Sequence, residues 1–197
     1  LIAYGQRLGF SGIRITSAEP LEIWKQEIEK RKRIDPETNR YWKRITTDPR
    51  DILPSAKSII VAVRAYIPYP ENFPNKIGRY SAHYREYPIG REKAGRLGDF
   101  LKQRGYDVVD DPPLPAKAIA HRAGVGYFGK NGVIHINGYG SWITLHCILT
   151  NAPLPPDESM DRLSDCGSCV ACVRACPTGA IQEGGMVLPD RCIRNYM

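Results

Sequence analysis

The pattern of apolar and polar positions predicts strands and helices that alternate over the first 155 residues. Residues 57–66 give the strongest strand signal, and their apolar run is continuous, which is typical of a central strand covered on both faces. Residues 12–16 alternate as a short strand, and residues 106–110 predict another. The β-branched, apolar stretch at residues 142–150 predicts a buried strand.

Helices are expected between these strands. The first is expected to end at Gly9, and a second to start within residues 17–20, where Pro20 suits a first helical turn. This second helix leaves through the basic residues 30–33, which we interpret as a solvated face favoured by the helix dipole, with phosphate contact as the alternative. An amphipathic helix is expected at residues 91–104 and a short one at residues 115–123.

Two further segments have their own signals. Residues 68–90 combine four prolines with five tyrosines or phenylalanines, and a long irregular aromatic segment after a central strand is where a binding loop is expected. Residues 133–137 and 142–150 are predicted to pair as a hairpin around Gly138 and Gly140.

The order of these elements predicts an α+β fold. We expect an α/β sandwich over residues 1–155, followed by a small cysteine-rich module over residues 156–197. Residues 151–156 hold three prolines and predict a stiff linker between the two.

Composition is compatible with this organisation. The 197 residues are 42% hydrophobic and 25% charged, so the chain can bury a core and is not of the disordered class. The longest apolar runs are about ten residues, too short to span a bilayer, so no membrane association is expected. The net charge of +7 permits a nucleic-acid partner without requiring one. The chain starts with Leu1 and stops at Met197 inside a predicted helix, so we expect a piece of a longer protein.

Four of the six cysteines lie close together, in the run Cys166-x2-Cys169-x2-Cys172-x3-Cys176-Pro177. A disulfide framework would spread its cysteines over the chain, and bridges across two-residue gaps are strained. Zinc usually takes two separated pairs of ligands. The observed run is typical of bacterial iron–sulfur ferredoxins, because two-residue gaps let a tight turn wrap three thiolates around one cubane. We interpret it as an iron–sulfur motif, with zinc as the alternative.

The cysteine count indicates two 4Fe–4S clusters. In two-cluster proteins the fourth cysteine of such a run ligates the other cluster. We therefore assign Cys166, Cys169 and Cys172 to one cluster, and Cys176 with Cys192 to a second that is incomplete in this chain. The remaining ligands are expected beyond residue 197. The alternative is a single cluster with an improvised fourth ligand.

The other cysteine and most histidines have no metal-like spacing with this run. Cys147 lies in the predicted strand 142–150 and is expected to be an inert core residue. His121, His135 and His146 are expected to be structural or solvated, whereas His83 lies in the predicted binding loop.

The glycine-rich stretch Gly124-Val-Gly126-Tyr-Phe-Gly129 matches G-x-G-x-x-G as a string. A dinucleotide fingerprint must follow a strand and open a helix, whereas this stretch follows a predicted helix and precedes a strand. We predict instead a helix C-cap that runs into a loop with exposed backbone and several left-handed positions. Such a loop can lie flat against a large planar ligand.

The residues of this loop and of the cysteine run, taken together, resemble a known family. Residues 122–131, the Gly-Ser-Trp at residues 140–142, the segment 165–181 and Arg191-Cys192-Ile193 are similar to the epoxyqueuosine reductases and, more distantly, to the reductive dehalogenases. The segment at residues 53–60 fits as well, so the resemblance covers nearly the whole chain.

The resemblance implies a cytoplasmic oxidoreductase. Its α/β domain would bind cobalamin and its ferredoxin-like module two 4Fe–4S clusters, which relay electrons from a flavodoxin- or ferredoxin-type donor of low potential. The reaction would remove the epoxide oxygen in the last step of queuosine synthesis in tRNA. A tRNA partner is compatible with the positive charge.

The resemblance also implies site residues. The cobalamin-binding set carried over from the motifs is Gly124, Gly126, Gly129, Lys130, Asn131, Ser141 and Trp142. The family has an Asp-Tyr-His segment with the Asp as proton donor; here Glu86 substitutes, Tyr87 aligns and Pro88 stands at the His position. The dehalogenases resemble this loop with a basic residue at the position of Lys130 and use a tyrosine proton donor, a part open to Tyr84 or Tyr87. The catalytic candidates are thus Glu86, Tyr87 and Lys130.

Three other functions stay open from the sequence. The departures around Glu86 leave room for a divergent reductase acting on another substrate, including a dehalogenase-like enzyme. A 4Fe–4S electron-transfer protein without a substrate of its own would have reducible clusters but no small-molecule pocket. A corrinoid-handling protein would bind cobalamin and turn over nothing.

Overall fold

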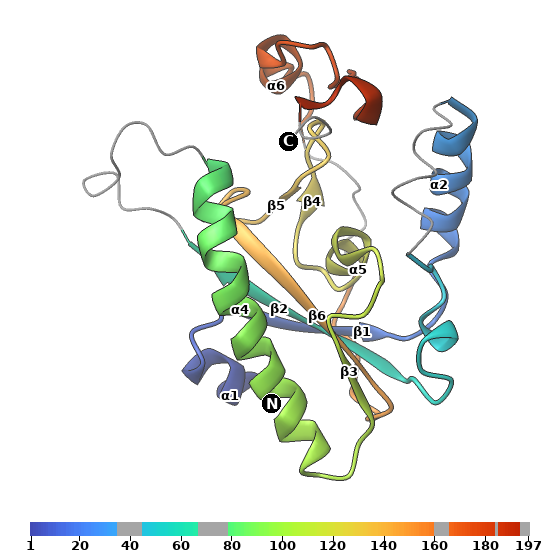
Figure 1. The fold of residues 1–197 in the computed structure, drawn as a ribbon, viewed down its shortest axis with the longest axis vertical. Coiled ribbons are helices and arrows are strands. Elements are labelled where there is room, and N and C mark those ends of the chain that lie inside the picture. The colour runs from blue at the N-terminus through green and yellow to red at the C-terminus, as the bar shows by residue number, and fades with distance from the viewer. Residues whose placement is uncertain (35–44, 67–78, 160–165, 184, 194–197) are drawn as a thin grey trace.

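A single antiparallel sheet of four strands organises the chain, whose computed structural model describes residues 1–34, 45–66, 79–159, 166–183 and 185–193 (Figure 1). The strand order is β1-β2-β6-β3, and every neighbouring pair is antiparallel. The strands are β1 (Gly12–Ser17), β2 (Ser58–Ala65), β6 (Ile143–Thr150) and β3 (Val108–Asp110). The fold is therefore a mixed α and β fold, as the sequence predicts.

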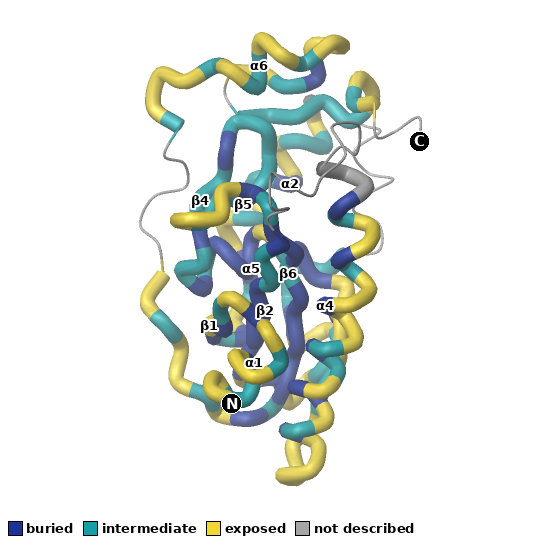
Figure 2. The backbone as a smooth tube through the Cα atoms, turned by 90° about the vertical axis from the view of Figure 1, so that its left-hand side faces the viewer, coloured by how far each residue is buried: buried dark blue, intermediate teal, exposed yellow. Residues whose placement is uncertain are grey.

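Helices cover both faces of this sheet. Alternate side chains of β2 point to opposite faces, so Val61 joins one core cluster and Ile60 the other. Residues of α5 (Ala116–Arg122) pack on the Val61 face, whereas α4 (Arg79–Lys102) packs on the Ile60 face. The central strands β2 and β6 are buried along nearly their whole length (Figure 2), which confirms the prediction of a covered central strand at residues 57–66.

The remaining elements are short and lie around the sheet. They are α1 (Ile2–Arg7), α2 (Glu22–Ile34), the 3-10 turn Pro49–Asp51, β4 (Tyr127–Phe128), β5 (Ile134–His135), α6 (Ala171–Ala175) and the 3-10 turn Pro189–Arg191. The first helix ends before Gly9, which adopts a φ of +86° as its predicted terminating role requires. No helix among the described residues is long and apolar enough to cross a membrane.

The predicted irregular segment at residues 68–90 is wrong for its second half. Residues 79–90 belong to α4, a continuous 24-residue helix, while residues 67–78 lie outside the described part of the chain. Pro88 is exposed inside this helix. The helix continues because residues on both sides of Pro88 are buried at helical spacing, Ala82 and Glu86 before it and Gly90 and Ala94 after it. Packing therefore outweighs the missing N–H of the proline.

The predicted hairpin of residues 133–137 with 142–150 is also wrong. The strand β6 pairs with β2 and β3, whereas β5 pairs with β4. Only an isolated bridge between Ile136 and Gly140 closes the turn, in which Gly138 and Gly140 have positive φ. An apolar strand buried on both faces belongs in the centre of a sheet, not in a two-stranded ribbon.

The segment predicted as a linker is tied to the sheet. The Ser58 hydroxyl donates to the carbonyl of Ala152 at 2.8 Å, and the Asp157 carboxylate accepts from the backbone N–H of Ile15 at 2.7 Å. Ala152 is fully buried. This proline-rich stretch therefore packs along the sheet before the chain reaches the cysteine-rich residues. The domain boundary at residue 155 stays a prediction.

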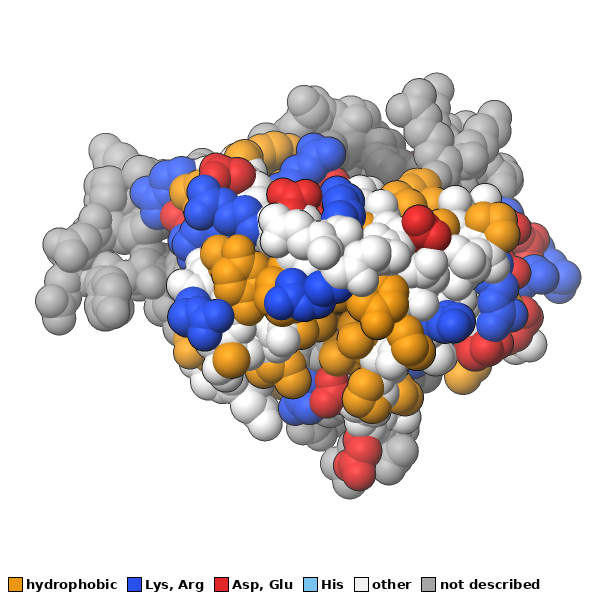
Figure 3. All heavy atoms as spheres, turned by 90° about the horizontal axis from the view of Figure 1, so that it is seen from below, with side chains coloured by type: hydrophobic (Ala, Val, Ile, Leu, Met, Phe, Trp, Pro, Cys, Tyr) orange, Lys and Arg blue, Asp and Glu red, His pale blue; other side chains and the backbone are white. Residues whose placement is uncertain are grey.

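The two ends of the molecule carry different features. Seen from below, the surface carries apolar side chains interrupted by lysine, arginine and acidic side chains (Figure 3), which is ordinary for a protein surface. At the opposite end, α6 and the β4–β5 ribbon lie near each other (Figure 1). The candidate chemistry lies at that end.

We predict that His146 makes the protein less stable as the pH falls from about 6.5 to about 4. Burial, followed by the positive charges of His83, Arg64 and Arg91, lowers the pKa of His146 to about 4, whereas an unfolded histidine titrates near 6.5. The unfolded state therefore binds more protons in this window. The free energy of unfolding falls by up to ~3 kcal/mol across it, and the contribution is complete above pH 6.5.

Urea unfolding at pH 7, 5.5 and 4.5 tests this prediction. His146→Gln removes the titrating ring, so the pH slope of its unfolding free energy should be shallower than that of the wild type. Parallel slopes for the two proteins would contradict the prediction.

Candidate functional site

The glycine-rich loop follows α5 and leads into β4, the order that the sequence predicts. The helix ends at Arg122, Ala123 caps it, and Gly124 takes a φ of +70°. Gly132 is left-handed too, whereas Gly126 and Gly129 are not. The C-cap is thus confirmed, and a dinucleotide fingerprint, which opens a helix, is not what this loop forms.

The three glycines of the motif let the protein's own chain approach closely. A Cβ on Gly124 would meet the carbonyl of Glu158, and one on Gly126 would meet the carbonyl of His135. At Gly129 a Cβ would lie 2.6 Å from both the Asn131 and the His135 side chains. Gly126 and Gly129 are buried. The glycines are therefore required by internal packing, and the flat exposed backbone that the sequence suggests is limited to part of the loop.

A polar hollow of about 320 Å³ lies beside this loop. The edge strand contributes Gly12 and Arg14, and the loop and the β5 turn contribute Gly124 and Tyr139. The rings of Tyr127 and His135 stack at its border, 5.7 Å apart and inclined by 14°. A hollow of this size takes a small molecule or part of a larger one.

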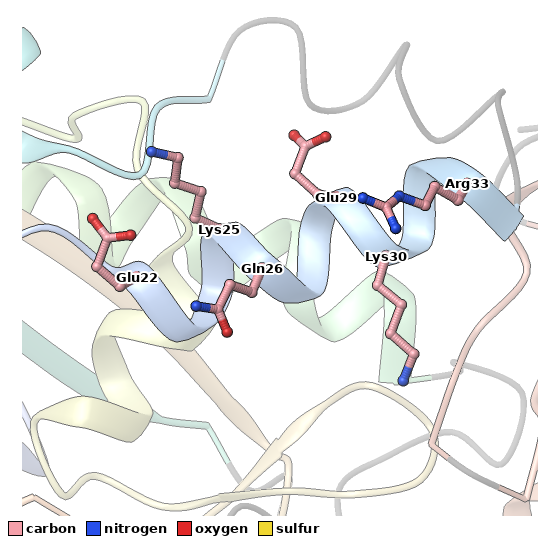
Figure 4. A pocket seen from close by; sticks show the side chains of 6 residues that line it. All are labelled: Glu22, Lys25, Gln26, Glu29, Lys30 and Arg33. Carbon is pink, nitrogen blue, oxygen red and sulfur yellow. The ribbon is translucent and has the colours of Figure 1, made fainter.

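A second hollow of about 310 Å³ lies along α2 and is lined only by side chains of that helix (Figure 4). These side chains do not converge on a common point. We therefore do not assign it a ligand. The residues are Glu22, Lys25, Gln26, Glu29, Lys30 and Arg33.

Lys130 lies in the turn between β4 and β5 and contacts the cysteine-rich segment. Its ammonium donates to the carbonyls of Gly167 at 2.9 Å and Cys169 at 3.0 Å. Next to it, the Asn131 side-chain oxygen accepts from the backbone N–H of Val133 at 3.2 Å and stabilises the turn. Both residues thus order this loop.

The other residues carried over from the motifs lie at the start of β6 and on α4. Ser141 is buried, and the ring of Trp142 packs edge-on against Tyr66 at 6.0 Å. Tyr66 lies in turn 6.2 Å from the ring of His83. Trp142 therefore belongs to an aromatic cluster with Tyr66 and with His83 of α4.

Glu86 and Tyr87 are neighbours on α4 with different surroundings. The buried Glu86 carboxylate pairs with the guanidiniums of Arg64 at 2.8 Å and Arg85 at 3.1 Å. The half-buried Tyr87 hydroxyl donates to Asp111 at 3.4 Å, and its ring lies 5.0 Å from that of His146. Burial, and then the negative charge of Asp111, raises the pKa of Tyr87, so its phenol keeps its proton.

The three catalytic candidates are not all brought together. Glu86 and Tyr87 lie on α4, but the contacts of Lys130 in the described part of the chain are with the cysteine-rich segment. The sequence did not indicate the partners Arg64 and Asp111, because they come from other elements. Asp111 has one local signal, a left-handed φ of +50° that aspartate tolerates better than most residues.

Arg122 was part of the recognised motif without an assigned role. Its guanidinium donates to the carbonyls of Ser17 at 2.6 Å and Glu19 at 2.7 Å. The segment at residues 17–20 was predicted to start a helix, but α2 begins only at Glu22. These carbonyls are thus outside the helix and available to Arg122, which fixes the end of α5 against β1.

The cysteine-rich segment turns tightly. The N–H of Cys169 donates to the carbonyl of Cys166 at 2.9 Å, and α6 follows. The hydroxyl of Thr178 and the backbone N–H groups of Ile181, Thr178 and Ala180 lower the pKa of Cys176 to about 7. Hydrogen-bond donors directed at a cysteine sulfur favour the thiolate, which is the form that binds metals.

These residues fit an iron–sulfur group by their chemistry. Soft thiolates in this spacing, with N–H donors around Cys176, are the donor set that such clusters use. Within the described ranges no three His, Cys, Asp or Glu side chains converge on one metal ion. Cysteines of a cubane each bind a different iron, so convergence on a single ion is not what a cluster requires. The five cysteines of this segment are half-buried except for the exposed Cys169: Cys166, Cys169, Cys172, Cys176 and Cys192.

Cys147 differs from these five in its burial. It is buried in β6 opposite Val61, and burial raises the pKa of its thiol to about 12. It is a core residue, as expected.

The chain is similar to curated epoxyqueuosine reductases over nearly its full length, although no family model matches it. It is 32% identical to the enzyme of Bacillus cereus over an alignment of 208 positions, which covers 98% of this chain and 54% of that protein. The enzyme of Listeria monocytogenes is 34% identical over the same shares of the two chains. The chain thus spans about half the length of the curated relatives it matches.

Solved structures agree with this similarity. A crystal structure of epoxyqueuosine reductase with an epoxyqueuosine-modified tRNA-Tyr stem loop superposes with a TM-score of 0.80, at 29% identity over 97% of this chain and 54% of that one. The enzyme from Streptococcus thermophilus gives 0.78 at 27% identity, again over 97% of this chain and 55% of that one. A catabolic reductive dehalogenase shares the fold, with a TM-score of 0.62 at 17% identity over 92% of this chain and 25% of that one.

We predict that Gly126→Ala destabilises the protein by about 1–3 kcal/mol, because the new methyl group would collide with the His135 carbonyl. Gly95→Ala is the matched control. No atom lies within 4 Å of a Cβ built at Gly95, inside α4, and there the same change should stabilise by about 0.5–1 kcal/mol. Urea midpoints measure both; equal shifts would show that the loop is not tightly packed.

We also predict that Cys169→Ala abolishes the visible absorption of an iron–sulfur cluster and lowers bound iron. Cys147→Ala should leave iron and absorption unchanged, because its thiol is buried and protonated. Metal analysis of both variants measures iron and zinc together. Zinc in place of iron in the wild type would contradict the cluster assignment.

Proposed function

Because this chain is a relative of the epoxyqueuosine reductases along nearly all of its sequence, we propose that it is part of an enzyme that removes the epoxide oxygen from epoxyqueuosine in tRNA. The single observation that carries the proposal is the continuous similarity, which includes the glycine-rich loop and the cysteine run in one alignable chain and fold. A ferredoxin module alone would share only the cysteines.

The proposed reaction consumes two electrons and two protons for each epoxide and releases water. Bound cobalamin and 4Fe–4S clusters would supply the electron-transfer chemistry, with electrons from a low-potential flavodoxin or ferredoxin. Cys166, Cys169 and Cys172 would hold one cluster, and Cys176 with Cys192 part of a second. We propose that the hollow beside Gly124 and Tyr127 contacts a peripheral part of the corrinoid, since about 320 Å³ is too small for the whole molecule.

Of the residues carried over for cobalamin, Gly124 and Gly126 line this hollow and the other five do not. Lys130 and Asn131 order the turn at one end of the loop, and Ser141 and Trp142 directly precede β6. In the proposal these residues shape the cofactor's surroundings while Gly126 and Gly129 keep the loop compact.

For the proton, the proposal favours Tyr87 over Glu86. The phenol keeps its proton, and a hydrogen bond from its hydroxyl to Asp111 fixes its orientation. The Glu86 carboxylate is engaged by two guanidiniums, so it would serve best as a stabiliser of α4 against β2 through Arg64. The proton donor of the reaction would then be a tyrosine.

Binding of tRNA would rely on phosphate contacts. The chain carries a net charge of +7, and its α2 ends in Arg31, Lys32 and Arg33, of which Arg31 and Lys32 pair with glutamates of the same helix. Exposed pairs of this kind are weak and can exchange for phosphate. The alternative functions, a corrinoid-handling protein and an electron-transfer protein, need no tRNA.

The proposal predicts conversion of epoxyqueuosine to queuosine in a tRNA stem loop. The assay uses the full-length protein, reconstituted anaerobically with iron, sulfide and cobalamin, with a low-potential reductant and mass spectrometry of the nucleosides. Retention of iron and corrinoid without conversion would favour a corrinoid-handling protein or another substrate. Iron without corrinoid would favour electron transfer alone.

Tyr87→Phe should lower kcat by at least about 100-fold if the phenol delivers the proton, with little change in KM. Tyr106→Phe is the control, since Tyr106 is an exposed tyrosine outside the site. Iron and corrinoid content should stay at the wild-type level in both. Unchanged kcat in Tyr87→Phe together with a loss in Glu86→Gln would reverse the roles of the two residues.

A further inference from the structure

Lys130 connects two segments that are distant in the sequence. Its backbone lies in the turn between β4 and β5, and its ammonium reaches the carbonyls of Gly167 and Cys169 at 2.9 and 3.0 Å. Both carbonyls belong to the turn that joins Cys166 to Cys169. The lysine therefore lies on the backbone of the first two cysteines of the run.

Residues 185–187, further along the cysteine-rich module, also lie close to the β4–β5 turn. A Cβ on Gly185 would lie 3.8 Å from the Lys130 Cα, and one on Gly132 would lie 3.2 Å from the Val187 side chain. The turn is also fixed from the other side, because the Lys117 ammonium donates to the Gly132 carbonyl at 2.7 Å. The position of the Lys130 ammonium is thus set by packing and not by the lysine alone.

Among the residues that the structure describes, the charge of this ammonium has no acidic counterpart. Its hydrogen bonds go to neutral carbonyls, and no carboxylate of the described residues forms an ion pair with it. Other lysines of the chain, such as Lys102, pair with aspartates. A cation held next to the cysteine turn acts electrostatically on a group bound there, because the interaction between charges grows as their distance shortens.

A 4Fe–4S cluster bound by four thiolates carries a net negative charge, which increases by one when the cluster takes up an electron. A nearby cation stabilises the more negative, reduced form and so raises the reduction potential. Net charge and hydrogen bonding around the sulfurs are among the properties that set cluster potentials.

We propose that Lys130 is a positioning residue that raises the reduction potential of the cluster held by Cys166, Cys169 and Cys172. It does so by holding its ammonium, which pairs with no described carboxylate, on the backbone between the first two of these ligands. The cluster takes up one electron at a time from the low-potential donor, and no bond to the lysine forms or breaks. The inference rests on the proposed function only in requiring that this cluster is bound.

The test compares midpoint potentials in the full-length protein after anaerobic reconstitution, by redox titration followed with electron paramagnetic resonance. Lys130→Met and Lys130→Gln remove the charge, and the glutamine keeps a donor for a carbonyl. At a fixed potential both should lower the ratio of reduced to oxidised cluster on the order of tenfold, which is a shift of about 59 mV for one electron. Lys130→Arg keeps the charge and should stay near the wild type.

Lys57→Met is the matched control for the loss of one positive charge. Lys57 is exposed and directly precedes β2, whose start lies away from α6 (Figure 1). Its cluster should titrate as in the wild type.

Three outcomes would overturn the inference. Equal potentials in Lys130→Met and the wild type, with intact clusters, would show that the charge does not act on the cluster. Loss of the cluster from both neutral variants, with Lys130→Arg intact, would make the lysine a structural clamp instead. Absence of iron from the wild type would remove the proposed function as well, and this is distinguishable because the first two outcomes leave a loaded wild-type protein.

Discussion

The pairing of β2 with β6 is the interaction on which the rest of the structure depends. Both strands are buried on both faces, and their eight-residue register fixes which side chains enter each of the two cores. A shift by one residue would move every side chain to the opposite face. Because β6 begins directly after the Gly-Ser-Trp at residues 140–142 and is followed by the segment that runs to the cysteines, this register also determines where both parts of the candidate site emerge from the sheet.

The glycine-rich loop connects the sheet and α5 to the cysteine-rich segment. Arg122 holds the end of α5 on carbonyls of the β1–α2 connection, close packing at Gly126 and Gly129 fixes the β4–β5 ribbon, and Lys130 carries the contact to the cysteine turn. A conformational role and a ligand-binding role are not exclusive for such a loop. However, the positions at which glycine is required are explained by the chain itself, so the glycines are weaker evidence for a cofactor than their motif suggests.

The sequence predicted the elements better than their partners. Periodicity identified β1, β2, β6 and α5, because burial on one or both faces leaves a local pattern, and the cysteine spacing identified its own chemistry. Strand pairing is not local. Residues 142–150 are predicted from the sequence to pair with residues 133–137, but a strand with two buried faces requires a central position, which β6 takes beside β2. Pro88 contributes to the wrong prediction of an irregular segment for a similar reason. The packing of the buried face of α4, which compensates for the proline, is visible only in the folded structure. Apart from Arg85, the partners of Glu86, Tyr87 and Lys130 come from other parts of the chain, and no spacing in the sequence encodes them.

The position of Lys130 bears on the comparison with the reductive dehalogenases. At 17% identity their structures share the fold with this chain and carry no residue roles over to it. A lysine that acted on a substrate would need its ammonium directed into an accessible hollow. Here the ammonium is engaged by two carbonyls of the cysteine turn, and Lys130 is not among the residues that line the hollow beside Gly124. In this chain the β4–β5 turn therefore holds the ammonium on the cysteine turn, and the lining of that hollow is made by other residues.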